Sequence, residues 1–286
     1  MPSFLALLAF LTAAGVQTDH VRIPTTGGLV LDAALVRPPR VTNLPAVVAL
    51  HGCGGPYASR DGSWAKELAA KGHIVLLPDS FGSRGLGPQC RVKQRTISPA
   101  RERREDAIAA ATWLAAQPGV PAGGIALVGW SNGGSTVLAT ARLGTPQGAH
   151  VGAPLGVRGS AAGPMALPSG LFARFVAFYP GCTGTARDTS WQPAAPMLIL
   201  IGAKDDWTPA EPCHQVADRF PERINANPVV MVTYPDAYHD FDTPDRPLRL
   251  LTGLATAQGG QAHAGTNVAA RDDALVRVPA FLAAGR

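Results

Sequence analysis

The sequence predicts one α/β domain built on an eight-stranded, mostly parallel sheet with helices on both faces. Short apolar runs rich in β-branched residues recur along the chain, and several are separated by segments with helical periodicity. This alternation of strand and helix is typical of a parallel sheet covered on both sides. The 286 residues would suffice for one large or two small domains, and no composition break or linker divides them.

Eight segments have the composition of strands. We expect strands at 21–23, 30–36, 46–51, 74–78, 125–129, 175–179, 198–202 and 229–234. The first two are joined through Gly27 and Gly28 with no room for a crossover helix, so they should form an antiparallel hairpin. Helical patterns predict helices at 64–71, 99–117, 133–143, 212–220 and 268–283. Ser98 and Pro99 are typical of a helix start, and Pro279 predicts a bend in the last helix.

The composition is that of a folded globular protein. Charged residues make up 16% of the chain and hydrophobic residues 46%, which excludes intrinsic disorder. The basic residues behind the formal net charge of +5 are scattered, and the cluster at 101–104 is offset by Glu102, Glu105 and Asp106. The sequence has no basic stripe interleaved with aromatic residues and no nucleic-acid-binding motif, so nucleic acid is not an expected partner.

The N-terminal residues have the pattern of a secretory leader. Residues 4–11 form an apolar run, and Ala13, Ala14 and Gly15 supply small residues for cleavage. We therefore expect a signal peptide at 1–17, a single mature domain at 18–286, and a periplasmic or secreted location. The alternative is an apolar strand or helix of the mature fold. The run is too short to span a bilayer, and no other stretch approaches ~18 apolar residues, so no stable membrane insertion is expected.

The four cysteines are spaced as disulfide partners and not as metal ligands. Cys53, Cys90, Cys182 and Cys213 lie far apart and form no C-x-x-C pair, which fits disulfides in an oxidising compartment. The seven histidines are also dispersed, and the sequence has no H-E-x-x-H motif. We therefore expect neither a metal site nor another cofactor.

The strongest chemical signal is the segment 125–134, IALVGWSNGG. It passes from an apolar strand through G-x-S-x-G into a helical pattern, which is typical of a nucleophile elbow. The tight turn requires small residues two positions before and after the serine, where Gly129 and Gly133 stand. Ser131 is therefore the expected nucleophile.

A serine nucleophile needs a base that accepts its proton and a carboxylate that orients the base. After a nucleophile elbow these residues follow in the order acid, then histidine. Asp205 and His239 each follow the end of a predicted strand, so they are the expected acid and base. His214 and His263 are competing bases, but neither of them follows a strand end.

The oxyanion that forms during acyl transfer needs backbone donors. One expected donor is the N–H of Asn132, directly after the nucleophile and at a helix N-terminus. The second is the N–H of Cys53, in the segment HGCGG at 51–55, because its glycines let the backbone approach a substrate.

Six motifs together resemble a known family. HGCGG, PDSFGSRG, GWSNGG, FYPGC, GAKDDWTP and AYHDF are similar to motifs of the dienelactone hydrolase-like family of α/β-hydrolases. The resemblance implies the α/β-hydrolase fold, with Ser131 as nucleophile, Asp205 as acid, His239 as base and Asp206 as the alternative acid. The chain departs from that family in carrying serine in place of a cysteine nucleophile, and in having no acidic residue within HGCGG.

This departure favours general ester chemistry over dienelactone itself. We expect a serine hydrolase that cleaves carboxylic esters or lactones of small-molecule substrates through an acyl-enzyme. A peptidase or amidase on the same fold is the first alternative, and a non-catalytic binding protein is the second. The sequence leaves the acyl group, the alcohol and the oligomeric state open.

Two further expectations concern loops after strand ends. Arg84 lies after the fourth strand, on the side where substrate binds, and is either a solvated loop residue or a ligand for a substrate carboxylate. If the strand order resembles that of other α/β-hydrolases, the third and fourth strands are neighbours, as are the sixth and seventh. Cys53 would then pair with Cys90, and Cys182 with Cys213, because bridged Cα atoms lie within ~7 Å.

Overall fold

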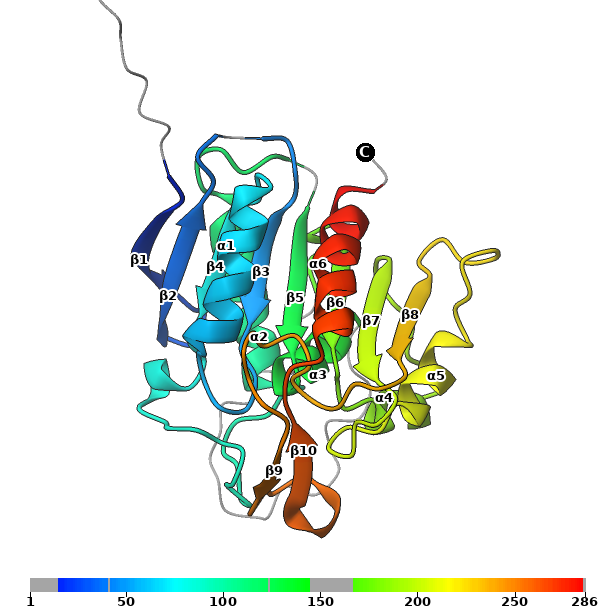
Figure 1. Cartoon of the computed structure of the whole chain (residues 1–286). Helices are drawn as coiled ribbons and strands as arrows, with labels where there is room; N and C mark the ends of the chain where they lie inside the picture. Colours follow the sequence, from blue (N-terminus) through cyan, green and yellow to red (C-terminus); the bar gives the residue numbers. More distant parts are fainter. Residues whose placement is uncertain (1–14, 41, 123, 145–166, 285–286) are drawn as a thin grey trace, which may run out of the picture.

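The computed structural model describes residues 15–40, 42–122, 124–144 and 167–284, and its main sheet has eight strands (Figure 1). They are β1 (Gln17–Pro24), β2 (Val30–Arg37), β3 (Ala46–Leu50), β4 (Val75–Pro78), β5 (Ile125–Trp130), β6 (Phe172–Phe178), β7 (Met197–Gly202) and β8 (Val229–Tyr234). The order across the sheet is β1-β2-β4-β3-β5-β6-β7-β8. The β1–β2 and β2–β4 pairs are antiparallel and the other pairs are parallel. The predicted fold class and N-terminal hairpin are confirmed.

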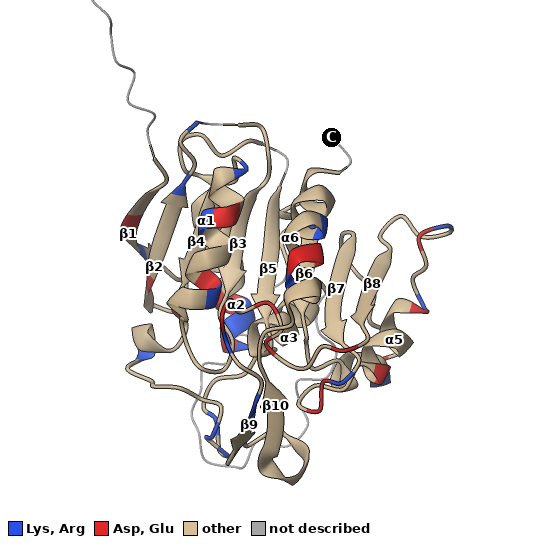
Figure 2. Cartoon of the chain, viewed as in Figure 1, with Lys and Arg blue, Asp and Glu red and all other residues tan. Residues whose placement is uncertain are grey.

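Helices cover both faces of this sheet. They are α1 (Ser63–Ala70), α2 (Glu102–Ala115), α3 (Asn132–Thr140), α4 (Thr183–Arg187), α5 (Glu211–Ala217) and α6 (Val268–Ala283). In Figure 1, α1 and α6 lie in front of the sheet, whereas α2 and α3 lie behind it. Charged residues are scattered over the helices and loops in this view (Figure 2).

The helices differ from expectation at the start of α2 and in α4, a short helix that our sequence analysis did not predict. α2 begins at Glu102, three residues beyond Pro99, and the N–H of Ser98 donates to the Glu102 carboxylate at 2.8 Å. α6 has the predicted bounds, 268–283, and contains Pro279. The buried face of α6 consists of Ala270, Ala274, Val278 and Leu282. Packing of this face against the core offsets the hydrogen bond that a proline removes.

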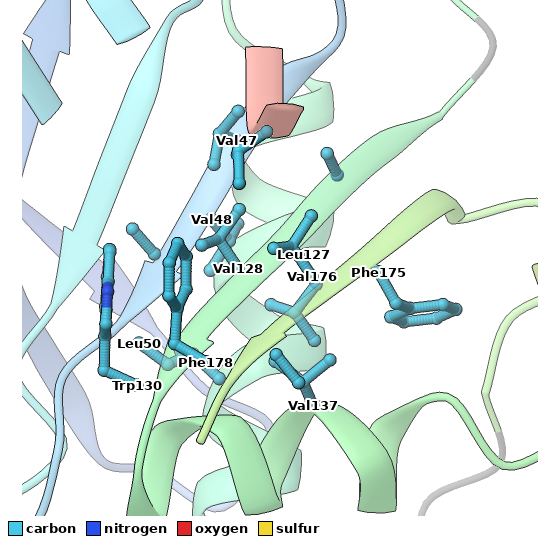
Figure 3. Packing of buried hydrophobic residues seen from close by; sticks show 14 of the residues in the cluster. Val47, Val48, Leu50, Leu127, Val128, Trp130, Val137, Phe175, Val176 and Phe178 are labelled. Atoms are coloured by element: carbon cyan, nitrogen blue, oxygen red, sulfur yellow. The ribbon is translucent and has the colours of Figure 1, made fainter. Parts of the chain in front are cut away.

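The central strands are buried on both faces, which explains their continuous apolar runs. Figure 3 shows Val47 of β3, Leu127 of β5 and Val176 of β6 in the core that these strands share. Trp130 and Phe178 close this core at the carboxyl ends of β5 and β6, with ring centroids 5.6 Å apart. The loops that follow these two strands are therefore anchored to a rigid base.

A two-stranded hairpin lies beyond the carboxyl ends of the main parallel strands (Figure 1). It consists of β9 (Arg249–Thr252) and β10 (Gln261–Ala264), which pair in antiparallel orientation. Our sequence analysis did not predict it, because both strands are short and β9 is mostly exposed. Contacts with other loops hold it instead. The N–H of Ala255 donates to the carbonyl of Cys90, and Ala264 forms a β-bridge with His239.

The predicted leader lies almost wholly outside the described residues, which begin at Gly15. β1 starts at Gln17, the last residue of that predicted leader. Across the described part of the chain, every helix is too short or too polar to cross a membrane.

Candidate active site

Ser131 stands at a sharp turn between β5 and α3, with a φ of 54° that non-glycine residues rarely adopt. The flanking glycines make this turn possible. A Cβ at Gly129 would lie 2.4 Å from the carbonyl oxygen of Gly133, and a Cβ at Gly133 would lie 2.1 Å from that of Leu50. The G-x-S-x-G pattern therefore has a steric cause, since larger residues would push the serine away from the strand end.

The structure brings the three expected catalytic residues together in one chain of hydrogen bonds. Nε2 of His239 lies 2.9 Å from Oγ of Ser131, and its Nδ1 lies 2.8 Å from Oδ2 of Asp205. The other carboxylate oxygen of Asp205 accepts the N–H groups of Trp207 and Thr208, at 2.9 and 2.8 Å. All three side chains are buried. The carboxylate is thus fixed on one side by the backbone and offers its second oxygen to the imidazole.

This geometry selects one tautomer of His239. A carboxylate accepts hydrogen bonds, so Nδ1 carries the proton and Nε2 presents its lone pair to the serine. Two aromatic rings restrict the imidazole further, because the Tyr179 and Trp207 ring centroids lie 4.5 and 4.6 Å from its own. The ring is therefore held with Nε2 directed at the Ser131 hydroxyl.

The alternative acid and bases lie elsewhere. Asp206 accepts the backbone N–H of His263 at 2.8 Å, and its Oδ2 lies 2.8 Å from Nδ1 of the same histidine. This pair holds the β9–β10 hairpin against the loop after β7. His214 lies in α5, where its Nε2 is 3.2 Å from the hydroxyl of Thr233. None of these three side chains is hydrogen-bonded to Ser131.

Both expected oxyanion donors border the serine. Cys53 and Asn132 line cavities that also contain Ser131, and Asn132 is the first residue of α3, where helical N–H groups have no partner within the helix. Arg103, which is fully buried in α2, connects the two donor segments. It donates to the side-chain oxygen of Asn132 and, at 2.7 Å, to the carbonyl of His51. Burial lowers the pKa of Arg103 to about 10.

The disulfides link loops at this same edge of the sheet. Cys53 is bonded to Cys90, with Cα atoms 4.9 Å apart, and Cys182 is bonded to Cys213, with Cα atoms 5.0 Å apart. These are the pairs expected from strand order. The first disulfide joins the HGCGG segment to the loop after β4, and the second joins α5 to the residue that precedes α4.

Arg84 does not take the substrate-binding role considered above. Its two terminal nitrogens each lie 2.8 Å from a carboxylate oxygen of Asp106, and Nη1 also donates to the carbonyl of Ser80. Arg84 lines neither of the cavities at Ser131. A bidentate pair with a buried aspartate uses the same fork that a substrate carboxylate would require. Arg84 therefore ties the loop after β4 to α2.

Two cavities meet at Ser131. The smaller, of about 270 Å³, is lined by Gly52, Cys53, Gly54, Gly55, Tyr57, Arg60, Pro88, Cys90, Ser131, Trp207, His239, Asp240, Arg246 and Leu251. The larger, of about 450 Å³, is lined by Cys53, Arg95, Pro99, Ser131, Asn132, Ser135, Gly181, Cys182, Thr183, Asp206, Trp207, Thr208, Pro209, Thr256 and Gln258. The nucleophile can thus face a substrate that extends in two directions.

A buried carboxylate that our sequence analysis did not identify lies behind the site. Asp242 accepts hydrogen bonds from the indoles of Trp64 and Trp130, both at 2.7 Å, and from the Tyr179 hydroxyl at 2.6 Å. Burial raises the pKa of Asp242 to about 6. Trp130 directly precedes Ser131, and Tyr179 packs on His239, so Asp242 supports the segments that carry these two residues. The sequence signal was its place in the motif HDFD, three residues after His239.

Asp240, the residue after His239, is also buried and carries a negative charge. It accepts from Arg60 at 2.7 Å and from Arg246. Burial acts to raise its pKa, but these two cations outweigh that effect and lower the pKa to about 2.

Within the described ranges, no group of three or more His, Cys, Asp or Glu side chains is arranged to hold a metal ion.

Comparison with known proteins gives one family match and several structural likenesses. A family model described as X-Pro dipeptidyl-peptidase (S15 family) matches residues 27–241. A candidate dienelactone hydrolase from Klebsiella pneumoniae superposes with a TM-score of 0.65 at 20% identity, covering 95% of this chain and 100% of that one.

Two more solved structures are similar. The dienelactone hydrolase-like promiscuous phosphotriesterase P91, from metagenomic libraries, has a TM-score of 0.60 at 18% identity, over 94% of this chain and 98% of that one. Dipeptidyl peptidase 4 of Porphyromonas gingivalis has a TM-score of 0.53 at 22% identity, over 79% of this chain but only 33% of its own. At these identities the likeness is one of fold.

Proposed function

This chain belongs to the X-Pro dipeptidyl-peptidase (S15) family, and we propose that within it the chain is a serine hydrolase of carboxylic esters or lactones. The observation that carries the proposal is the continuous hydrogen-bond chain from Ser131 through His239 to Asp205. A hydroxyl, an imidazole and a carboxylate in this geometry are the groups that acyl transfer requires. The proposal needs no metal or other cofactor.

In the first half-reaction, Oγ of Ser131 attacks the substrate carbonyl carbon and its proton passes to Nε2 of His239. The carbonyl oxygen becomes an oxyanion, which accepts the backbone N–H groups of Cys53 and Asn132. The imidazolium formed at His239 is stabilised by Asp205 and gives its proton to the departing alkoxide. The alcohol leaves, and the acyl group stays on Ser131 as an ester.

In the second half-reaction, water attacks this acyl-enzyme. His239 accepts the water proton through Nε2, and the same backbone donors bind the second oxyanion. Collapse of the intermediate returns the proton to Oγ of Ser131 and releases the carboxylic acid. A lactone follows the same steps, except that the alcohol and the acid remain in one product.

The near-complete coverage of dienelactone hydrolase-like structures supports ester or lactone substrates over peptides. Those likenesses extend over more than nine-tenths of both chains, whereas the P. gingivalis peptidase shares only a third of its length. The family match itself favours a second candidate, cleavage of a peptide after X-Pro. The same triad could serve both bonds.

The test is a panel of p-nitrophenyl esters of increasing acyl length, small lactones and X-Pro p-nitroanilides, assayed with the wild type and Ser131→Ala. We expect the esters or lactones to be the better substrates, and Ser131→Ala to lower their turnover ~10³- to 10⁶-fold while the protein remains folded. Ester activity retained within tenfold would contradict the mechanism. Faster cleavage of the anilides would favour the peptidase, and absent labelling by a fluorophosphonate would favour a binding protein.

A further inference from the structure

Three arginines line the two cavities at Ser131, and two of them already have acidic partners. Arg60 donates to Asp61 at 2.8 Å and to Asp240 at 2.7 Å. Arg246 donates to the other carboxylate oxygen of Asp240. The charges in the smaller cavity are therefore balanced by the protein itself, which leaves Arg95 of the larger cavity to be considered.

Arg95 has no acidic partner among the described residues. Its Nε donates to the carbonyl of Gln89 at 3.0 Å, and its Nη2 is buried without a hydrogen-bond partner. Burial lowers its pKa. The residues outside the described ranges contain no Asp or Glu side chain that could pair with it. A partly desolvated guanidinium without a countercharge is costly, so an anion bound there would recover free energy.

The rest of the larger cavity is suited to such an anion. Hydroxyl and amide side chains line it at Ser135, Thr183, Thr208, Thr256 and Gln258. Its acidic lining residue, Asp206, is held by the backbone and ring of His263. Arg91 and Lys93 precede Arg95 on the same loop between β4 and α2, and Arg91 donates to the carbonyl of Thr252 in β9 at 3.0 Å.

The chemistry at Ser131 indicates which part of the substrate enters this cavity. His239 must protonate the leaving alcohol, and it lines only the smaller cavity. Asn132, whose N–H is a proposed oxyanion donor, lines only the larger one, and Cys53, the other proposed donor, lines both. The alcohol therefore extends into the smaller cavity and the acyl chain into the larger one, towards Arg95.

We propose that the acyl chain carries a carboxylate that Arg95 binds, so that half-esters of dicarboxylic acids are preferred over neutral esters. This inference rests on the proposed ester hydrolysis. Arg95 is a specificity residue and takes no part in bond cleavage. A guanidinium donates charge-assisted hydrogen bonds to a carboxylate, and such a contact also directs the acyl chain along the cavity.

The kinetic test compares the mono-p-nitrophenyl ester of adipic acid with p-nitrophenyl hexanoate. The two acyl chains have the same number of carbons and differ only in the terminal carboxylate. Arg95→Gln should lower the ratio of kcat/KM for the adipate ester to that for the hexanoate by about 10- to 100-fold, as expected for a hydrogen bond between charged groups. Lys93→Gln is the matched control. It removes the same charge from the same loop, outside both cavities, and should leave this ratio near the wild-type value.

A binding measurement separates this inference from the hydrolytic function. Calorimetry with the Ser131→Ala protein should detect monomethyl adipate binding more tightly than methyl hexanoate, and adding Arg95→Gln should remove the difference. An unchanged ratio in Arg95→Gln, or an equal loss in Lys93→Gln, overturns the inference. If Arg95-dependent binding is seen while the wild type hydrolyses neither ester, the carboxylate site stands and the proposed ester hydrolysis fails.

Discussion

Asp205 and Asp206 are adjacent in the chain, yet their carboxylates have different partners. Only Asp205 reaches His239, whereas Asp206 holds His263 of the hairpin. We expect Asp205→Asn to lower kcat/KM for ester hydrolysis by ~10⁴-fold, because an amide no longer selects the required tautomer. Asp206→Asn is the matched control and should cost far less. The reverse ranking, measured on the same ester, would transfer the role of acid to Asp206.

Asp242 gives a prediction about stability and pH. Its pKa in the folded protein is about 6, above the value of 3.8 for an exposed aspartate, so the folded state binds this proton more tightly than the unfolded state does. Its contribution to the free energy of unfolding is therefore greatest below pH ~4 and is lost as the pH rises to ~6, by at most about 3 kcal/mol. Asp242→Asn removes this titration.

Urea unfolding of both proteins between pH 4 and 7 tests this prediction. The stability of the wild type relative to Asp242→Asn should fall as the pH rises through that window. Asp240 is present in both proteins, so its low pKa of about 2 cancels in the comparison. Parallel pH profiles would mean that Asp242 does not titrate in this range.

At the scale of elements, the turn from β5 into α3 tolerates no side chain at its glycines. A Cβ at Gly133 would lie 2.1 Å from the carbonyl oxygen of Leu50, which precedes the HGCGG segment. We expect Gly133→Ala to lower the free energy of unfolding by about 2–4 kcal/mol and to impair ester hydrolysis, because the elbow must shift. Gly62→Ala is the control, since a Cβ there meets no atom within 4 Å. Equal denaturation midpoints for the two variants would refute the steric argument.

The elements differ in how far their sequences specify them. The strands of the main sheet are apolar enough to be identified individually, and the strand before Ser131 and the helix after it follow from the elbow pattern. The β9–β10 hairpin is different, because its mostly exposed first strand carries no strong pattern and its position depends on bonds to distant loops. Leu251 of β9 lines the smaller cavity. Thr256, in the segment between β9 and β10, lines the larger one.

At the scale of the whole molecule, two disulfides join loops at the carboxyl edge of the sheet. They close segments with sequence separations of 37 and 31 residues. A disulfide that closes a segment of this length is expected to raise the free energy of unfolding by about 4 kcal/mol, because it restricts the unfolded chain. We therefore expect reduction of both disulfides to lower the midpoint of thermal unfolding markedly.

The check is non-reducing peptide mapping of protein that was expressed with residues 1–17 included. It should recover the Cys53–Cys90 and Cys182–Cys213 peptides and detect cleavage of the leader. Four free thiols would contradict both disulfides and the periplasmic or secreted location together, because disulfides persist in oxidising compartments.

The sequence by itself determined the fold class and the local geometry at Ser131. Both depend on short-range features: apolar runs that must be buried, and glycines where a Cβ would collide with the backbone. It also singled out Asp205 and His239, since each follows a strand whose carboxyl end lies at the edge where Ser131 emerges.

Only the tertiary structure decided which charged groups pair with one another. Arg84 pairs with Asp106, and Asp206 pairs with His263. Arg60 and Arg246 both pair with Asp240, whereas Arg95 has no acidic partner among the described residues. Such pairings join segments up to 180 residues apart. They depend on distances of a few ångströms between loops, and no periodicity or local motif encodes those distances, because they arise only when the whole sheet has assembled.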